Sequence, residues 1–223
     1  MPDFLGAVFF DVDGVLIDSL PQHLAICRDK AMEFGLNLRI PTVEEFRELV
    51  RRGTKVSPMR YFFLAVGFPE NLVERAVADY ENEFMQLYRP AAFAGVDKLL
   101  ATLRNAGLKL GLVTSNTRAN VVPALGNSME YFDQRCLFYF DRYPVPKPKP
   151  WCLLEGARLL EVKAQECTYV GDQPADATAA FDAGLGFLGV TYGWGISERD
   201  TQYVKAKNVL EIAQKLVGLH AQP

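Results

Sequence analysis

The chain has 223 residues, of which 49% are hydrophobic and 23% charged, and its formal net charge is -3 at pH 7. A chain of this size can bury one sizeable core, or one core and a small second module. The slight negative charge argues against a general nucleic-acid binder, and no apolar run approaches the roughly 18 residues of a membrane span.

Short apolar runs alternate with helical patterns over most of the chain. The runs predict buried strands over 4–10, 108–114, 136–140, 166–172 and 185–193. Between them, apolar residues recur at helical spacing and predict helices over 95–107, 117–126, 151–160 and 174–184. Strands that alternate with helices favour right-handed crossovers. We therefore predict an α/β fold with a doubly wound parallel sheet.

The segment between the first strand and residue 93 breaks this alternation. It shows helical patterns over 20–34, 43–51, 57–66 and 69–88, punctuated by glycine and proline. We therefore predict a helical module inserted after the first strand. The core domain would comprise residues 1–17 and 93–223, and the inserted helical domain residues 18–92.

Polar side chains follow several of the predicted strands at the point where each strand ends. In open parallel sheets, ligands bind at the carboxyl ends of the strands. We therefore expect these side chains to converge on one site. They are Asp11 and Asp13, Thr114, Ser115 and Asn116, Lys147, and Asp172 and Asp176.

Asp11 and Asp13 stand together in 9-FFDVDGVLIDS-19. Residues i and i+2 of an extended chain point to the same side, so both carboxylates can face one pocket, and Gly14 gives room for a close ligand. Converging carboxylates repel one another unless a cation lies among them, and Mg²⁺ suits oxygen ligands and substrate phosphate. One aspartate could then attack phosphorus and form an aspartyl-phosphate, while the other acts as general acid and then base.

Other residues suit the binding of a phosphoryl group. Lys147 would supply fixed positive charge, although Lys149 in 147-KPKP-150 is an alternative. Thr114 and the amides that follow it, at Ser115 and Asn116, would donate hydrogen bonds to the phosphoryl oxygens.

The inserted module carries its own candidate residues. Arg52 and Lys55 lie in a basic loop between two predicted helices. This loop is either a solvated charge run or a loop that reaches an anionic group away from the phosphate. We expect His23 to be incidental, with a position facing the cleft as the alternative, and Trp194 to pack beside the last strand.

The ordered set DVDGVLIDS, TSN, KPKP and GDQPAD resembles the four motifs of the haloacid dehalogenase superfamily, over nearly the whole chain. The helical insertion resembles the small cap of that family. The segment 184-GLGFLGVTYGWG-195 is similar to the phosphoglycolate-phosphatase-like branch. The resemblance implies a Rossmann-like core with an inserted α-helical cap.

The resemblance also implies a role for each motif residue. The dehalogenating branch lacks an acid at the position of Asp13, so the chain resembles phosphate-transferring members instead. The family pattern K-P-x-P favours Lys147 over Lys149. The implied roles are Asp11 as nucleophile, Asp13 as acid and base with its carbonyl on Mg²⁺, Thr114 as phosphate-binding hydroxyl, Lys147 as partner of the nucleophile, and Asp172 and Asp176 at the metal.

The leading hypothesis is therefore a Mg²⁺-dependent phosphatase that hydrolyses a small phosphorylated metabolite, with phosphoglycolate as first candidate. A sugar-phosphate mutase similar to β-phosphoglucomutase is the alternative, although 53-GTKVSPM-59 matches the mutase pattern only loosely. A phosphonate hydrolase is less favoured because it needs an imine-forming cap lysine, for which Lys30 and Lys55 are available. A binding protein on a degenerate hydrolase fold is disfavoured by the intact motif set.

Composition and cysteine spacing also predict the setting of the protein. The four cysteines lie far apart, with no pair at C-x-x-C spacing, and the chain has two histidines. We therefore expect no zinc site, and we expect a reduced, cytoplasmic setting. No basic segment precedes the first apolar run, so we expect no signal peptide. We expect a small phosphate ester as partner, no nucleic acid, no membrane, and a monomer or a homodimer.

Overall fold

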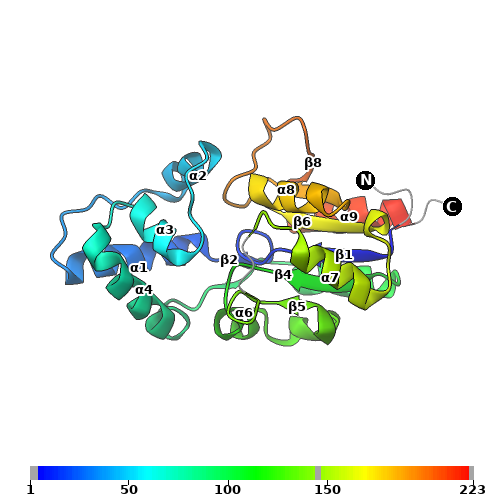
Figure 1. Ribbon diagram of the computed structural model, residues 1–223, viewed down its shortest axis with the longest axis horizontal. Helices are drawn as coiled ribbons and strands as arrows, with labels where there is room; N and C mark the ends of the chain where they lie inside the picture. Colours follow the sequence, from blue (N-terminus) through cyan, green and yellow to red (C-terminus); the bar gives the residue numbers. More distant parts are fainter. Residues whose placement is uncertain (1–4, 144–146, 221–223) are drawn as a thin grey trace.

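The computed structural model describes residues 5–143 and 147–220, and within them a six-stranded parallel sheet forms the centre of the larger part of the molecule (Figure 1). The strand order is β5-β4-β1-β6-β7-β8. The predicted parallel α/β core is thus confirmed. The strands are β1 (Ala7–Phe10), β4 (Lys109–Val113), β5 (Leu137–Phe138), β6 (Cys167–Gly171), β7 (Gly186–Val190) and β8 (Val204–Ala206).

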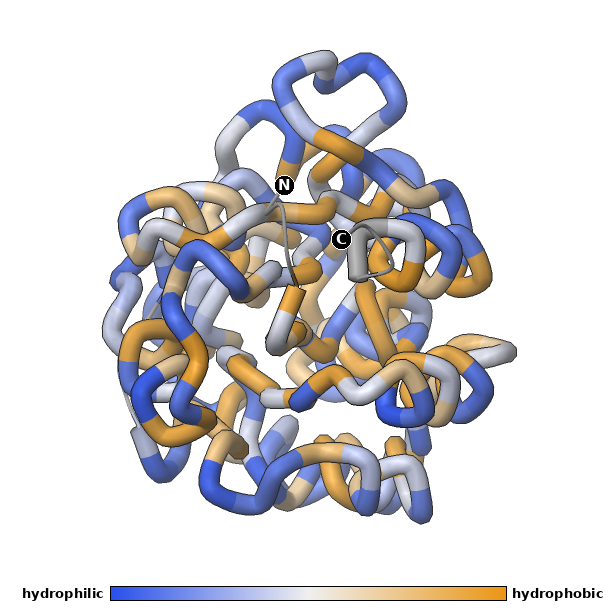
Figure 2. The backbone as a smooth tube through the Cα atoms, turned by 90° about the vertical axis from the view of Figure 1, so that its right-hand side faces the viewer, coloured by the Kyte–Doolittle hydropathy of each residue, from blue (hydrophilic) through white to orange (hydrophobic). Residues whose placement is uncertain are grey.

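Helices cover both faces of the sheet. Alternate residues of each strand point to opposite faces, so each strand contributes to the core on both sides. Val8 and Phe10 of β1 pack into a cluster with helices α5 (Val96–Asn105), α6 (Arg118–Leu125) and α9 (Val209–His220). Ala7 and Phe9 pack on the other face, in a cluster with α7 (Trp151–Leu160) and α8 (Pro174–Asp182). Figure 2 shows hydrophobic segments within this part and largely hydrophilic outer loops.

Some predicted bounds differ from the structure. The expected strand over 185–193 ends at Val190, and the expected strand over 136–140 pairs only at Leu137–Phe138. Phe4, at the start of the first apolar run, lies outside the described residues. β8 and α9 were not expected. Three residues with a lysine between them give too short an apolar pattern to indicate a strand such as β8.

The inserted segment folds into helices α1 to α4 followed by a π-helix, and we call residues 20–88 the helical cap. The four expected helices are present. Thr42 begins α2 with a capping box, in which its side chain accepts from Glu45 N–H and the Glu45 carboxylate accepts from Thr42 N–H. The bounds are α1 (Leu20–Glu33), α2 (Val43–Arg51), α3 (Met59–Ala65), α4 (Glu70–Glu83) and the π-helix (Phe84–Tyr88).

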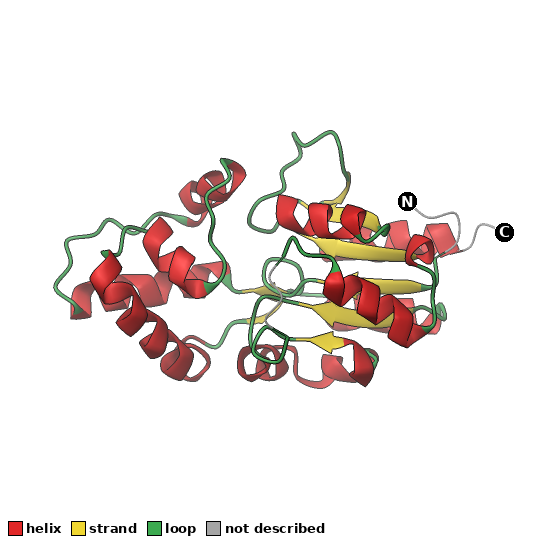
Figure 3. Cartoon of the chain, in the orientation of Figure 1, coloured by secondary structure: helices red, strands yellow, loops and turns green. Residues whose placement is uncertain are grey.

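Two short segments join the helical cap to the sheet. β2 (Ile17–Asp18) and β3 (Ala91–Ala92) pair antiparallel, and Figure 3 shows both between the cap helices and the sheet. The predicted division of the chain at residues 17/18 and 92/93 falls at this two-stranded ladder. That division into domains stays a prediction. Within the described residues, no helix is long and apolar enough to cross a membrane.

A buried lysine of α1 forms ion pairs with carboxylates of α4. Lys30 Nζ lies 2.7 Å from Glu33 Oε2, 2.8 Å from Glu83 Oε2 and 3.5 Å from Asp79 Oδ2. Burial acts to lower the pKa of Lys30, but hydrogen bonds from its ammonium to Glu33 and Glu83 outweigh burial and raise it. An imine-forming lysine needs the opposite shift, so Lys30 does not suit the phosphonate-hydrolase alternative.

Replacing Lys30 by methionine is expected to lower the free energy of unfolding by about 1–3 kcal/mol, since it removes hydrogen bonds between charged groups at a buried position. Urea unfolding at neutral pH measures the change. The matched control is Arg39→Met, which removes an ion pair with Glu45 from a side chain that is 78% exposed. The control should cost less than about 1 kcal/mol. Equal losses in the two variants would contradict a special role for Lys30.

Candidate active site

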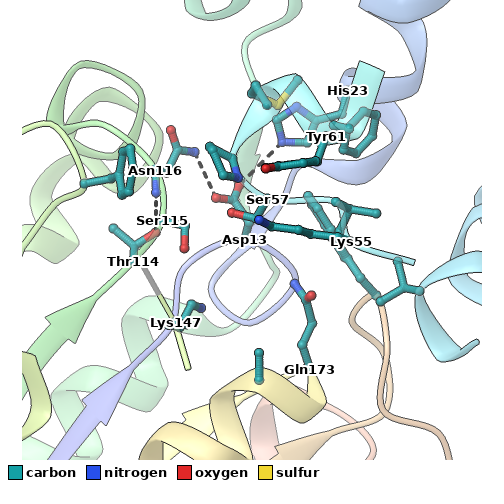
Figure 4. A pocket seen from close by; sticks show the side chains of 18 of the residues that line it. Asp13, His23, Lys55, Ser57, Tyr61, Thr114, Ser115, Asn116, Lys147 and Gln173 are labelled. Atoms are coloured by element: carbon teal, nitrogen blue, oxygen red, sulfur yellow. Dashed lines mark hydrogen bonds and ion pairs between the residues drawn. The ribbon is translucent and has the colours of Figure 1, made fainter. Parts of the chain in front are cut away.

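A cavity of about 890 Å³ lies between the carboxyl edge of the sheet and the helical cap. Figure 4 shows side chains from both parts facing it, with Thr114, Lys147 and Gln173 on the sheet side. Lys55 and Tyr61 enter from the cap. The expected residues that line this cavity are Asp11, Asp13, Lys55, Thr114, Ser115, Asn116, Lys147 and Asp176.

Three carboxylates meet at the edge of the cavity. Asp11 follows β1, Asp172 follows β6, and Asp176 lies in the first turn of α8; one oxygen of each lies within 4.8 Å of the other two. Asp176 Oδ2 accepts hydrogen bonds from the amides of Asp172 (3.2 Å) and Gln173 (3.0 Å). Asp172 Oδ2 accepts from the Trp194 amide at 2.6 Å, whereas the buried Asp172 Oδ1 has no hydrogen-bond partner.

Lys147 is the cation of this cluster. Its Nζ lies 2.6 Å from Asp11 Oδ2 and 2.6 Å from Asp176 Oδ1, and its side chain is 12% exposed. Burial acts to lower the pKa of Lys147, but Asp11 and Asp176 outweigh burial and raise it, so the ammonium stays charged. Lys149 is exposed and lies outside the cavity wall. The geometry therefore favours Lys147 as the lysine of the third motif.

The cluster carries more negative charge than Lys147 can balance. Burial raises the pKa of Asp11 to about 7, with Lys147 opposing the shift and Asp176 adding to it. Burial, Asp176 and Asp11 raise the pKa of Asp172 well above its usual range. A buried carboxylate oxygen without a partner, in a set of hard oxygen donors, fits a divalent cation such as Mg²⁺. The residues present thus fit the expected metal.

Asp13 lies in the cavity wall but its carboxylate is turned away from the three-carboxylate cluster. Oδ1 accepts from Ser19 Oγ at 2.6 Å and lies 3.8 Å from His23 Nε2, and Oδ2 accepts from Asn116 Nδ2 at 2.9 Å. Burial acts to raise the pKa of Asp13, but His23, Ser19 and Asn116 outweigh burial and lower it. A metal contact through the Asp13 carbonyl stays a prediction.

Thr114, Ser115 and Asn116 lie at the end of β4, where the chain turns into α6. Thr114 is buried, and its Oγ1 accepts from the Asn116 amide at 3.0 Å, which leaves the hydroxyl proton free to be donated. The Thr114 amide is already used, since it donates to Phe138 O at 3.0 Å. The hydroxyl of Thr114 can therefore turn to a phosphoryl oxygen, whereas the Asn116 amide, which we expected to donate to one, already donates to Thr114.

Two of the expected binding residues do not reach the cavity wall. Gly14 has φ 77° and packs against the Asp172 carboxylate, so the space beside it holds a protein side chain instead of a ligand. The Arg52 guanidinium lies 3.1 Å from Glu48 Oε1 on a side chain that is 72% exposed, because the two residues face each other one helical turn apart. Arg52 is thus a solvated charge, the first of the two alternatives for the basic loop, whereas Lys55 lines the cavity.

Two residues differ from our first interpretation of the sequence. His23 lines the cavity, as its alternative position facing the cleft required, and its ring stacks on Phe84 at 4.5 Å between centroids. Trp194 packs among cap residues instead of beside the last strand, with its ring 5.4 Å from that of His23. Both contacts join segments far apart in the chain, so no local sequence pattern indicates them.

Comparisons with known proteins agree with this arrangement. Residues 8–190 match the model of a family described as haloacid dehalogenase-like hydrolase. The chain is 32% identical over 208 residues to a phosphoglycolate phosphatase of Xanthomonas campestris pv. campestris, covering 88% of each. It is 28% identical over 219 residues to an N-acetylmuramic acid 6-phosphate phosphatase of Pseudomonas aeruginosa, covering 96% of this chain and 94% of the other. A solved structure of a candidate phosphoglycolate phosphatase from Lactobacillus plantarum aligns with a TM-score of 0.76 at 22% identity, over 96% and 99% of the chains.

The parallel sheet, the carboxylate cluster and its lysine define an α/β protein with a charged ligand site at the carboxyl edge of its sheet. The chain belongs to the haloacid dehalogenase-like hydrolase family. The resemblance stated from the four motifs is thus confirmed, and with it the expected enzyme class, a phosphatase of this family.

Replacing Lys147 by methionine is expected to lower kcat/KM for p-nitrophenyl phosphate by about 100-fold or more, since it removes a fixed charge that faces the reacting group. The matched control is Lys149→Met, a neighbouring lysine that is exposed, and it should keep the activity of the unmodified chain. Steady-state kinetics on both variants decides between the two lysines. A large loss in Lys149→Met with little loss in Lys147→Met would reverse the assignment.

Proposed function

We propose that this chain is a Mg²⁺-dependent phosphatase that hydrolyses a small phosphorylated metabolite through an aspartyl-phosphate on Asp11. The observation that carries the proposal is the position of the Asp11 carboxylate. It lies in a buried cluster with two other carboxylates, 2.6 Å from Lys147, in the wall of a cavity large enough for a metabolite. A buried carboxylate beside a fixed cation at the edge of a ligand pocket suits a nucleophile.

Asp11, Asp172 and Asp176 would hold the cation. When bound, a divalent cation neutralises the excess charge of the cluster and draws electron density from phosphoryl oxygens. Lys147 and the Thr114 hydroxyl would bind the same phosphoryl group from the protein side, where their positions are fixed before the substrate arrives. Fixed donors of this kind stabilise the charge of the transition state without rearranging.

The reaction would proceed in two displacements at phosphorus. A carboxylate oxygen of Asp11 forms a bond to phosphorus while the bond to the leaving alcohol breaks, and Asp13 gives its proton to the leaving oxygen. Water then attacks the phosphorus of the aspartyl-phosphate, and Asp13 takes the proton that the water loses. The products are the alcohol, inorganic phosphate and the original carboxylate of Asp11.

Lys55 supports a substrate that carries a second anionic group. Of the cavity-lining cations in the described chain, Arg60 pairs with Glu70 and Glu74, and Lys147 pairs with Asp11 and Asp176. Lys55 has no carboxylate partner among the described residues and lies 3.7 Å above the Tyr61 ring. Its ammonium is thus available for a carboxylate of the substrate.

Phosphoglycolate is the first candidate, because it carries a phosphate and a carboxylate and is the substrate named for the curated relative of 32% identity. The cavity of about 890 Å³ lies near the upper end of the roughly 300–1,000 Å³ of small-molecule sites. A carboxylated sugar phosphate, as named for the Pseudomonas relative, is therefore a second candidate of the same chemistry.

Removing divalent cations with a chelator is expected to abolish phosphate release, and Mg²⁺ is expected to restore it, since the cation balances the carboxylate cluster. The assay measures phosphate released from phosphoglycolate, sugar phosphates, nucleotides and pyrophosphate. Asp11→Asn should lower kcat by about 10³-fold or more, as removing a nucleophile does.

The matched control is Asp18→Asn, the same substitution at an exposed position of the first motif, and it should keep full activity. Full activity in Asp11→Asn would overturn the aspartyl-phosphate mechanism. Isomerisation of a sugar phosphate without net phosphate release would show that a hydroxyl replaces water as acceptor, and would favour the mutase alternative.

Replacing Lys55 by methionine is expected to raise KM for phosphoglycolate about tenfold, since a charge-assisted hydrogen bond contributes about 1.5–3 kcal/mol. KM for p-nitrophenyl phosphate, which has no second anionic group, should change little. Arg52→Met is the matched control, because its side chain faces solvent, and it should leave both values unchanged. Equal increases in KM for the two substrates would contradict recognition of a distal anion by Lys55.

A further inference from the structure

One loop touches both the carboxylate cluster and the helical cap. It follows β7 and comprises residues 192–195. On the cap side, Arg47 Nη2 donates to Tyr192 O at 2.7 Å. A side-chain carbon at Gly195 would lie 3.0 Å from Val50 of α2, so the backbone of the loop packs directly against the cap. The loop is therefore fixed between the two parts of the molecule.

Trp194 extends this contact into the hydrophobic core of the cap. Its indole lies edge-on to His23 at 5.4 Å and to Phe62 at 5.9 Å between ring centroids. Within the described chain, Trp194 is the one buried member of the cap's hydrophobic cluster that comes from outside residues 20–84. It is 7% exposed. The indole thus packs into the cap core, with one edge against Gly14, although its backbone belongs to the loop after β7.

The backbone of the same loop holds Asp172. The Trp194 amide donates to Asp172 Oδ2 at 2.6 Å, and the amides of Gly195 and Ile196 donate to Asp172 O at 3.1 and 2.7 Å. A side chain at Gly193 would collide with the Asp172 side chain and with Gly14 O. One carboxylate oxygen is therefore occupied by the loop, and the other, Oδ1, is buried with no partner.

We propose that Trp194 is a positioning residue that couples the seating of the helical cap, meaning its packing against residues 192–195, to the orientation of Asp172 in the cation site. The indole, held in the cap core, fixes the place of its own amide. The amide fixes Asp172 Oδ2 and so leaves Oδ1 to the cation. The proposal rests on the cation site of the proposed function, but not on the identity of the substrate.

The coupling acts in both directions, because a free energy shared between two sites is reciprocal. A seated cap favours the cation-binding orientation of Asp172, and a bound cation favours the seated cap. The simpler interpretation is that Trp194 only anchors the cap by apolar packing. In that case its removal would loosen the cap and leave the affinity for the cation unchanged.

The test is the affinity for Mg²⁺, measured by calorimetric titration of the chelator-treated full chain, so that no turnover enters the readout. Trp194→Ala is expected to weaken Mg²⁺ binding about 10- to 100-fold, as the loss of a partner that orients a metal ligand does. Trp194→Phe, which keeps an aromatic ring in the cap core, should restore most of the affinity.

The matched control is Phe68→Leu. Phe68 is buried in the same cap cluster, against Phe34 and Phe63, and within the described residues its ring makes no aromatic contact with the loop. This variant should lower thermal stability and keep the Mg²⁺ affinity. Equal Mg²⁺ affinity in the unmodified chain and in Trp194→Ala would overturn the coupling while leaving the cation site intact.

A second measurement follows the cap directly. The chain has two tryptophans, so in a Trp151→Phe background Trp194 alone emits. Mg²⁺ is expected to change this emission as the cap becomes more firmly seated, and Asp172→Asn should remove the change. Unchanged emission at Mg²⁺ saturation would overturn the coupling. Failure of the unmodified chain to bind Mg²⁺ would overturn the cation site and the coupling together.

Discussion

Asp11, Asp172 and Asp176 form a buried cluster of carboxylates, in which the ammonium of Lys147 lies 2.6 Å from an oxygen of Asp11 and of Asp176. Buried carboxylates are costly unless each finds a cation or hydrogen-bond donors. The fold supplies donors to Asp176 from two backbone amides and to one oxygen of Asp172 from the loop after β7. Burial, with the neighbouring carboxylates of Asp176 and Asp11, raises the pKa of Asp172. The excess of negative charge that remains explains why the site suits a divalent cation.

The strand order brings these charges together. β1 lies between β4 and β6, so the residues after β1 stand between those that follow its two neighbours. Asp11 is thereby placed between Thr114 on one side and Asp172 on the other. The fourth group, Lys147, comes from the loop after β5 at the sheet edge and must extend inward to reach Asp11. A parallel sheet thus converts four separate segments into one charged site.

The site residues that follow strands could be predicted from the sequence, because the carboxyl ends of parallel strands meet at one edge whatever the details of packing. The contacts made by cap residues could not be predicted from the sequence. Arg52 and Lys55 look alike in the sequence, and only the helical turn that gives Arg52 a partner in Glu48 separates them. Trp194 joins the cap core through a contact with His23 across most of the chain length, and β8 is too short to show a pattern.

Asp11 and Asp13 stand two residues apart, yet their carboxylates have different surroundings. Burial raises the pKa of Asp11 to about 7 among core residues, whereas donors that include His23 of the cap outweigh burial and hold the pKa of Asp13 low. Pairs of carboxylates with opposed environments suit opposed roles in one reaction. A phosphoryl group beside Asp13 adds negative charge and raises its pKa toward that of a proton donor. Because His23 belongs to the cap and lies 3.8 Å from Asp13 Oδ1, the position of the cap would affect proton transfer in the proposed mechanism, whereas the sheet would position Asp11 for attack on phosphorus.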